Sequence, residues 1–368
     1  MAERRPQEAE ALVRPHLASG TGPIPLWKML ANAVLAQGRV EECRAIRQMI
    51  VDAVPGDLAN RFDLAEVLLL MGDFEQGWIE YRWRYSLAHT TRIERKVQRP
   101  RWEGNRIAGR TLLIHDEQGF GDTFQFLRMV PWAKERSGAR IILEINPHAL
   151  SLAKRTGGFD EIVVKGELPP PFDLHCEMMS LPMAMGLKMA DLPGPVPYMT
   201  PDPTRLAKWR RHLGHLSRPL VALVWAGRPD HLNDANRSMT LADLAPLAMP
   251  GATFLAIQKG PAAEQAAHPP AGMTLIPLSD KIEDFEDTAA ILAIADLLIS
   301  IDSSPVHLAG ALGRPVWAML PHIPDWRWLM DRDDSPWYPS LRLFRQTGGG
   351  DWAGVTARVA EALKDLKP

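Results

Sequence analysis

The residues best suited to chemistry follow an apolar run in residues 297–317, which read LLISIDSSPVHLAGALGRPVW. The run predicts a buried strand that ends at Asp302. A helix should follow, because Ser304 is a natural N-cap and Pro305 suits the first helical position, where its missing N–H is not needed. The free N–H groups of that turn and the helix dipole would bind an anion, with phosphate the best fit. The alternative is ordinary capping with nothing bound. His307, on the first turn, either reaches the same ligand or is structural.

A second loop, in the stretch IHDEQGFGDTFQFLRMV, offers carboxylates after another expected strand. Its glycine spacing does not match a phosphate-binding loop, and we expect the glycines to allow a sharp turn with room for a ligand. Asp122 is either the N-cap of the next helix or a catalytic base. These roles conflict, because accepting backbone N–H bonds lowers the pKa of a carboxylate. Glu117 is the spare carboxylate. The predicted substrate contacts of this loop are Gln118, Gly119 and Gly121.

A third polar segment, LVWAGRPDHLNDANRSMTLADL, leaves an expected strand and runs into a helix. A cation here would stabilise the negative charge that develops on a departing phosphate. Arg237 is the first choice for this role and Lys259, in IQKG, is the second; a surface salt bridge is the alternative for Arg237. Asn233 could close the loop or touch a ligand. The predicted substrate contacts of this half are Trp225, Asn233, Lys259, Asp302, Ser303, Ser304 and His307.

Other polar and aromatic clusters are weaker signals. Asp287 and Thr288 indicate a helix start. The tryptophans of residues 324–339 could stack on a ligand, but we expect them to be core. The triplet at residues 331–333 has the form Asp-x-Asp, yet it does not end a buried strand, and no His/Cys cluster has metal-ligand spacing. We therefore predict no metal and no cofactor. The tryptophans in question are Trp326, Trp328 and Trp337.

The elements that position these residues alternate between short apolar runs and helical stretches from residue 110 onward. This alternation predicts parallel sheets covered on both faces. Two Rossmann-like halves would place a cleft between their facing carboxyl strand ends, where open α/β sheets bind ligands; two unrelated α/β domains are the alternative. Expected strands are 111–116, 140–145, 161–164, 172–176, 220–225, 253–258, 273–278, 296–301 and 315–320. Expected helices are 122–138, 148–156, 203–213, 241–248, 287–295, 304–312 and 351–366.

The first 90 residues contain an internal repeat. Leu30 aligns with Leu64 and Gly38 with Gly72, each at an offset of 34 residues. This register resembles the tetratricopeptide repeat, which is a pair of antiparallel helices with Gly in the turn. About two and a half repeats would offer a concave surface for a protein partner, or would form a helical cap that packs on the next domain.

These patterns divide the chain into five parts. We expect tetratricopeptide-like helices in 1–90, a linker in 91–109, a first Rossmann-like domain in 110–217, a second in 218–350 and a C-terminal helix in 351–368. Net charge is -2, which gives no reason to expect nucleic acid as a partner. Two distant cysteines, no apolar signal region and no long apolar window favour a cytoplasmic protein without a membrane span.

The motif from Asp302 to Pro315 resembles the nucleotide-sugar motif of the ADP-heptose:lipopolysaccharide heptosyltransferases, glycosyltransferase family 9. Residues 110–365 as a whole resemble bacterial tetratricopeptide-fused glycosyltransferases, notably in VWAGRPDHLNDANRS, LAIQKG and PDWRWLMDRDDSPWYPSLRLFRQ. Ser303 and Ser304 stand where the heptosyltransferases have Thr and Gly. Arg237 matches the position of a basic residue in that family, and Asp122 matches the Gly-Asp of its first loop.

The resemblance implies the GT-B fold, with the acceptor mainly on the first Rossmann-like domain and the nucleotide-sugar on the second. It also implies an inverting, metal-independent transfer, with Asp122 as base and Arg237 beside the leaving diphosphate. We expect a nucleotide-sugar donor, and the repeats suggest a protein acceptor; a lipid-linked or polysaccharide acceptor is the alternative. The alternatives are an enzyme of the nucleotide-sugar epimerase type on the same fold, and an inactive scaffold that only binds.

Overall fold

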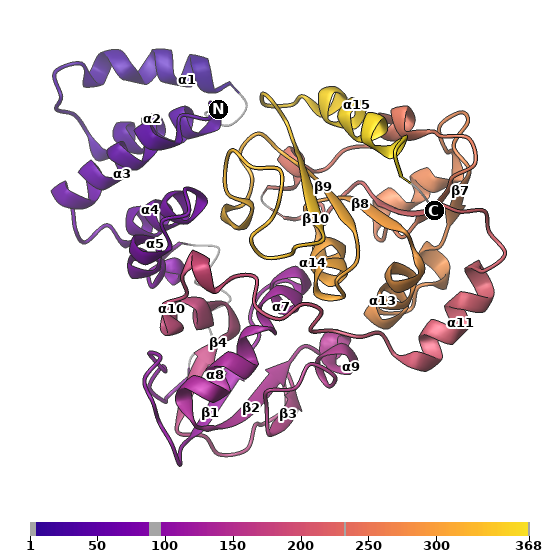
Figure 1. Ribbon diagram of the computed structural model, residues 1–368. Coiled ribbons are helices and arrows are strands. Elements are labelled where there is room, and N and C mark those ends of the chain that lie inside the picture. The colour runs from indigo at the N-terminus through magenta and orange to yellow at the C-terminus, as the bar shows by residue number, and fades with distance from the viewer. Residues whose placement is uncertain (1–4, 88–96, 232, 367–368) are drawn as a thin grey trace.

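The computed structural model describes residues 5–87, 97–231 and 233–366. Residues 91–96 of the predicted linker lie outside these ranges. Figure 1 shows a helical N-terminal part and two sheets, each flanked by helices. The helical part lies beside the loops at one end of the second sheet.

The N-terminal part consists of paired helices. Its elements are α1 (Pro6–Val13), η1 (Arg14–Leu17), α2 (Ile24–Ala36), α3 (Val40–Ala53), α4 (Leu58–Leu70), α5 (Phe74–Tyr81) and η2 (Arg84–Ser86). Helix α2 packs on α3, and α4 packs on α5. Gly38 and Gly72 end α2 and α4 with φ of +82° and +83°, a conformation that favours glycine. The two turns are therefore alike, while the assignment of these helices to the tetratricopeptide class stays a prediction.

The first sheet is parallel and has the strand order β3-β2-β1-β4. Its strands are β1 (Thr111–His115), β2 (Arg140–Ile145), β3 (Glu161–Val164) and β4 (Leu174–Glu177). Its helical segments are α7 (Phe120–Phe126), α8 (Met129–Ser137), η3 (Pro147–Ala149), α9 (Leu150–Ala153), η4 (Met178–Ser180), α10 (Leu181–Met185) and η5 (Met189–Asp191). Helix α11 (Pro203–Leu213) follows them in the chain and packs on a helix of the second sheet.

The helix predicted for 122–138 is wrong, since the segment forms two helices, α7 and α8. Pro131 has no N–H to donate to the carbonyl of Leu127, so the helix breaks about one turn before the proline.

The second sheet is also parallel, with the order β10-β9-β8-β5-β6-β7. Its strands are β5 (Leu220–Val224), β6 (Thr253–Ala256), β7 (Leu275–Pro277), β8 (Leu297–Ile301), β9 (Val316–Leu320) and β10 (Leu341–Arg345). Its helical segments are α12 (Asp234–Arg237), η6 (Leu241–Leu247), η7 (Pro261–Ala267), η8 (Ser279–Lys281), α13 (Phe285–Ile294), α14 (Ser304–Ala311), η9 (Trp326–Trp328) and α15 (Trp352–Leu363).

Two expectations for this sheet need correction. Strand β10 was not predicted, and η6 replaces the α-helix expected at 241–248. Pro246 lies inside η6, where it removes one donor of an α-helical ladder. The mixed α/β prediction with parallel sheets is confirmed.

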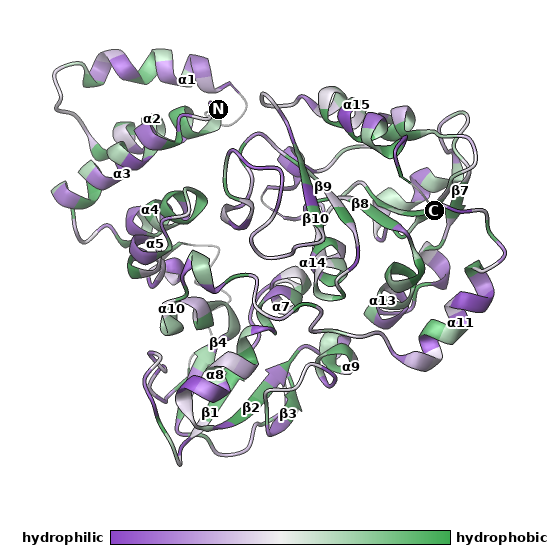
Figure 2. Ribbon diagram, in the orientation of Figure 1, coloured by the Kyte–Doolittle hydropathy of each residue, from purple (hydrophilic) through white to green (hydrophobic). Residues whose placement is uncertain are grey.

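Each sheet reverses its strand order at one point. The reversal lies between β1 and β4 in the first sheet and between β5 and β8 in the second. In open parallel sheets, ligands bind beyond the carboxyl strand ends at such a point. Helix α13 is apolar after its acidic first turn, whereas α11 is mostly hydrophilic (Figure 2).

The helical part packs against the second sheet through aromatic rings. Phe74 and Trp78 of α5 contact Trp326 with ring centroids 6.4 Å and 5.6 Å apart. The indole N–H of Trp78 donates to the backbone carbonyl of Leu187 at 2.8 Å. All three aromatic rings are buried. This interface fixes α4 and α5 relative to the loops that carry the candidate site.

Candidate functional site

A cavity of about 1500 Å³ lies where the helical part and the two sheets meet. The helical part contributes one wall, and loops after β5, β9 and β10 contribute another. The loop between β1 and α7 supplies Gln118, and the first turn of α7 supplies Asp122. Polar residues around the cavity include Asn32, Arg47, Asp63, Glu66, Gln118, Asp122, Arg228, His231, Asn233, Asp325 and Arg327.

The predicted anion site lies at the strand reversal of the second sheet. Helix α14 begins at Ser304, so the N-cap is Ser303 and not Ser304 as predicted. The Ser303 side chain makes no capping bond, and its Oγ lies 2.9 Å from the Oγ of Ser300. Pro305 has no N–H, and the N–H of Val306 donates to the carbonyl of Ser303 at 3.0 Å, so Ser304 supplies the first-turn N–H that remains for an anion.

His307 is buried beside this helix start rather than on an open surface. Its ring stacks on Trp328 with centroids 5.3 Å apart, and its Nδ1 lies 3.1 Å from the hydroxyl of Tyr338. Burial lowers the pKa of His307 well below its usual value, so the ring is neutral. Asp302 lies 4.0 Å from Nε2 of His307. Burial and the nearby Asp325 raise the pKa of Asp302 to about 6.

Arg237 lies at the end of α12, and its guanidinium reaches the second sheet's strand reversal. Nη1 donates to the carbonyl of Asp302 at 3.1 Å, and Nε lies 3.4 Å from a carboxylate oxygen of Asp234. The predicted cation and the predicted anion site are therefore adjacent. Asn233, from the same segment, lines the cavity.

Two other predicted contacts lie elsewhere. Trp225 is fully buried within the core of the second sheet. Lys259 donates to the carbonyls of Ser279 and Ile282, at 2.8 Å and 3.0 Å. The structure does not bring either side chain to the cavity wall.

Asp122 is the third residue of α7, whose N-cap is Gly119. The N-cap alternative for Asp122 is therefore wrong. Its Oδ2 accepts the N–H of Gly119 at 3.0 Å, and its Oδ1 pairs with the guanidinium of Arg327. Gly119 does not have the positive φ that favours glycine. A Cβ on Gly121 would lie 2.9 Å from the ring of His307, so Gly121 allows α7 to approach α14 and does not leave open room for a ligand.

Arg327 is a site residue that the sequence reasoning missed. Its buried guanidinium also pairs with Asp325 at 2.8 Å and donates to the side chain of Gln125 at 2.6 Å. Burial by itself would lower the pKa of Arg327, but the negative charges of Asp325 and Asp122 raise that pKa above its usual range. An arginine between two tryptophans was the available signal. Its partner Asp122 lies 205 residues away in sequence, which hid the pairing.

The remaining predicted residues have structural roles. Glu117 pairs with Arg84 at 2.8 Å, and each side chain is 2% exposed, so Glu117 is not a spare carboxylate of the cavity. Asp287 accepts the indole N–H of Trp209 at 2.7 Å, and Asp284 caps α13. The expectation that the three tryptophans of 324–339 are core is confirmed, since Trp326, Trp328 and Trp337 are at most 5% exposed.

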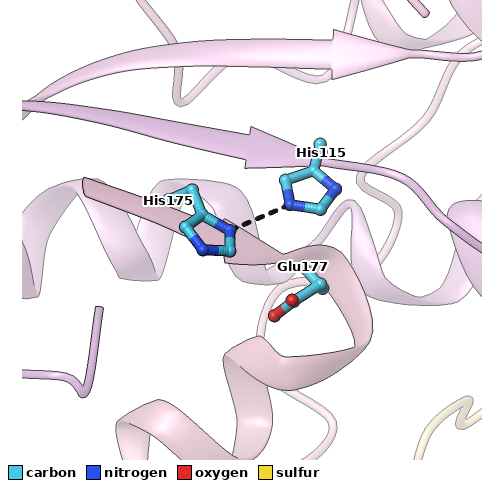
Figure 3. A group of neighbouring side chains, drawn as sticks. All are labelled: His115, His175 and Glu177. Carbon is cyan, nitrogen blue, oxygen red and sulfur yellow. Dashed lines mark hydrogen bonds between the residues drawn. The ribbon is translucent and has the colours of Figure 1, made fainter. Parts of the chain in front are cut away.

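One buried group has the composition of a metal site. His115 ends β1, and His175 and Glu177 lie on the neighbouring β4, with their ligand atoms within 4.8 Å of one another (Figure 3). The two imidazoles are already 3.2 Å apart as a hydrogen-bonded pair. Glu177 accepts from Arg101 at 2.6 Å and from Ser180 at 3.1 Å. The carboxylate is therefore satisfied by protein donors, and the cluster is a hydrogen-bonded network as it stands.

No helix within the described ranges is long and apolar enough to cross a membrane. Searched against protein-family models, the chain matches none. It is 29% identical over 345 residues to Protein FlbA from Caulobacter vibrioides, covering 85% of this chain and 56% of FlbA. The chain thus spans little more than half the length of this curated relative.

Two solved structures share the fold. One is a glycosyl transferase family 9 protein from Veillonella parvula, with TM-score 0.50 and 10% identity over 72% of this chain and 92% of that one. The other is the E. coli ADP-heptose lps heptosyltransferase II, with TM-score 0.52 and 15% identity over 69% and 97%. At these identities the likeness concerns architecture. The chain therefore has the two-sheet α/β fold of these transferases over about 70% of its length.

Proposed function

We propose that this protein is a glycosyltransferase of the GT-B type, which moves a sugar from a nucleotide-sugar donor to an acceptor with inversion and without a metal. One observation carries the proposal. The strand reversals of the two sheets meet, because α7 packs on α14. The start of α14, where Arg237 contacts Asp302, thereby lies beside the first turn of α7, which carries Asp122: a Cβ on Gly121 would lie 3.5 Å from Cα of Ser304. Figure 1 shows α7 next to α14.

The donor's diphosphate would bind at the start of α14. The N–H of Ser304 and the helix dipole attract an anion, and Arg237, which donates to the carbonyl of Asp302, adds a full positive charge beside them. Both groups favour the diphosphate more strongly as it departs, because its negative charge grows as the glycosidic bond breaks. These protein groups provide the charge stabilisation that a metal ion would otherwise supply.

The transfer is a single displacement. The acceptor oxygen forms a bond to the anomeric carbon from the face opposite the leaving group, and the bond from that carbon to the diphosphate oxygen breaks with its electron pair. The acceptor's proton passes to a carboxylate of the cavity. The sequence predicts Asp122 for this role, and a base in such a position contributes roughly 10²–10⁴-fold in rate.

We further propose that the acceptor is a protein. The cavity of about 1500 Å³ extends along the helical part, whose residues form a full wall of it. Drug-sized ligands occupy pockets of about 300–1,000 Å³. The additional room and the helical wall suit an acceptor chain that reaches the reaction centre past α2, α3 and α4.

The test combines turnover with binding. Wild type is incubated with a panel of nucleotide sugars, release of the nucleoside diphosphate is measured, and thermal shifts are recorded with each diphosphate. Arg237→Gln should weaken diphosphate binding and lower kcat, because it removes the charge beside Asp302. Lys259→Gln is the matched control, since the ammonium of Lys259 donates to the carbonyls of Ser279 and Ile282 and not to the segment at Asp302 that Arg237 contacts. Wild type that turns over no donor and binds no diphosphate would refute the proposal.

A further inference from the structure

A carboxylate on the helical wall faces the cavity without a partner. Glu66 lies on α4, lines the cavity and is exposed to it. It makes no ion pair or side-chain hydrogen bond within 5–87, 97–231 and 233–366. Nearby Asp63 pairs with Arg47 at 2.7 Å, so the helix presents one engaged carboxylate and one available one.

Asp122 differs from Glu66 in this respect. Both of its oxygens are engaged, one by the N–H of Gly119 and one by the guanidinium of Arg327. Protein donors thus hold both carboxylate oxygens of Asp122, whereas Glu66 has no such donor among the described residues. Accepting a proton would require Asp122 to give up an ion pair with a buried arginine.

The two carboxylates share the same end of the cavity. Arg327, which pairs with Asp122, also acts electrostatically on Glu66. The negative charges of Asp122 and Glu66 both act on the hydroxyl of Tyr81. Glu66 on the helical wall and Asp122 on α7 therefore both line the cavity within electrostatic range of Arg327.

The charged groups around Glu66 are mixed in sign. Asp325 and Asp63 oppose its ionisation, and Arg327 and Arg47 favour it. Removal from water by the surrounding protein is the largest cause that raises the pKa of Glu66 to about 8, and the two aspartates add to it, even though the side chain itself is open to the cavity. A general base works best when its pKa lies near the operating pH, so this environment suits proton transfer.

We propose that Glu66 of the helical part is a catalytic residue of this site and takes the acceptor's proton, while Asp122 holds Arg327 in place. This inference rests on the proposed transfer reaction and deepens it. It moves the base from Asp122, where the sequence analysis put it, to a helix outside both Rossmann-like domains. The helical part then completes the reaction centre in addition to offering a surface for a partner.

The step balances without any further reactant. The O–H bond of the acceptor breaks and its proton goes to the carboxylate of Glu66. The freed electron pair forms the bond to the anomeric carbon, and the diphosphate departs with the electron pair of the broken bond. Water can serve as the acceptor, so the step is measurable before the physiological acceptor is known.

The experiment measures hydrolysis of whichever nucleotide sugar wild type turns over, with water as acceptor and pH varied on both sides of about 8. Glu66→Gln keeps the shape of the side chain and removes the base. Glu66→Asp keeps the carboxylate but draws it back. Glu75→Gln is the control, because Glu75 is an exposed carboxylate on the next helix and does not line the cavity. Melting temperature and the Kd for the nucleoside diphosphate are recorded for every variant.

We expect Glu66→Gln to lower kcat by about 10²–10⁴-fold and to abolish the rise of rate with pH, with Kd unchanged. Glu66→Asp should recover part of the rate, and Glu75→Gln should match wild type. A Glu66→Gln variant with the kcat and pH profile of wild type would overturn the inference and leave the transferase intact. If wild type turned over no donor and bound no nucleoside diphosphate, the proposed function itself would be contradicted, and this inference with it.

Discussion

Asp122→Asn separates the two roles that Asp122 can have. The substitution removes the negative charge that pairs with the buried guanidinium of Arg327. The side chain of Arg327 is 7% exposed and that of Asp122 is 24% exposed. Removing one partner of a fully buried ion pair costs about 3–5 kcal/mol. Arg327 retains Asp325 and Gln125, and Asn can still accept the N–H of Gly119. The expected loss is therefore smaller, about 2–3 kcal/mol.

Thermal unfolding measures this loss. At about 1–2 °C per kcal/mol for a chain of 368 residues, Asp122→Asn should lower Tm by about 2–6 °C. Asp325→Asn is the matched control, because it removes the other carboxylate from Arg327, and its greater exposure of 35% predicts a smaller drop. A double-mutant cycle with Arg327→Met should show coupling of about 0.5–3 kcal/mol between Asp122 and Arg327.

Kinetics then tests the reasoning. If Asp122 holds Arg327 and Glu66 takes the proton, Asp122→Asn lowers kcat by less than about 10-fold at a temperature where the variant is folded. A variant with unchanged Tm and a kcat lower by about 10²–10⁴-fold would refute the assignment, and Asp122 would be the base.

Three further predictions follow from other contacts. Gly310→Ala should destabilise the protein by about 1–3 kcal/mol, because the added Cβ would lie 2.5 Å from the ring of Tyr338; Gly348→Ala, in open space, is the control in the same melting experiment. The raised pKa of Glu66 should make wild type lose stability as pH rises from the unfolded value of 4.5 to about 8, and denaturant unfolding of Glu66→Gln should lack this loss. Asp325→Asn should shift the pH–rate profile to lower pH, because Asp325 helps to raise the pKa of Glu66. An unshifted profile would contradict the assignment of Glu66 as the base.

The sequence predicted the parts of the molecule that depend on local pattern. Apolar runs between helical stretches indicated parallel strands, and the strand that ends before Asp302 was predicted within one residue of β8. The N-cap of the following helix was predicted one residue late, because both Ser303 and Ser304 have capping side chains and local sequence does not separate them.

The missed features depend on contacts between distant segments. Arg327 becomes a site residue through its ion pairs with Asp122 and Asp325. Glu66 reaches the site because α4 packs against η9. The glycines of the first loop suggested backbone freedom, whereas Gly121 is needed for the approach of α7 to His307. Periodicity or spacing within one segment does not predict such contacts between distant segments.

Turnover of nucleotide sugars by wild type and Arg237→Gln tests the central claim most directly. Nucleoside diphosphate release would be followed alongside NMR of the anomeric proton of the product. The account predicts that wild type consumes at least one donor with inversion at the anomeric carbon, and that Arg237→Gln loses both diphosphate affinity and rate. Wild type that is inert toward every donor and shows no thermal shift with any nucleoside diphosphate would contradict it.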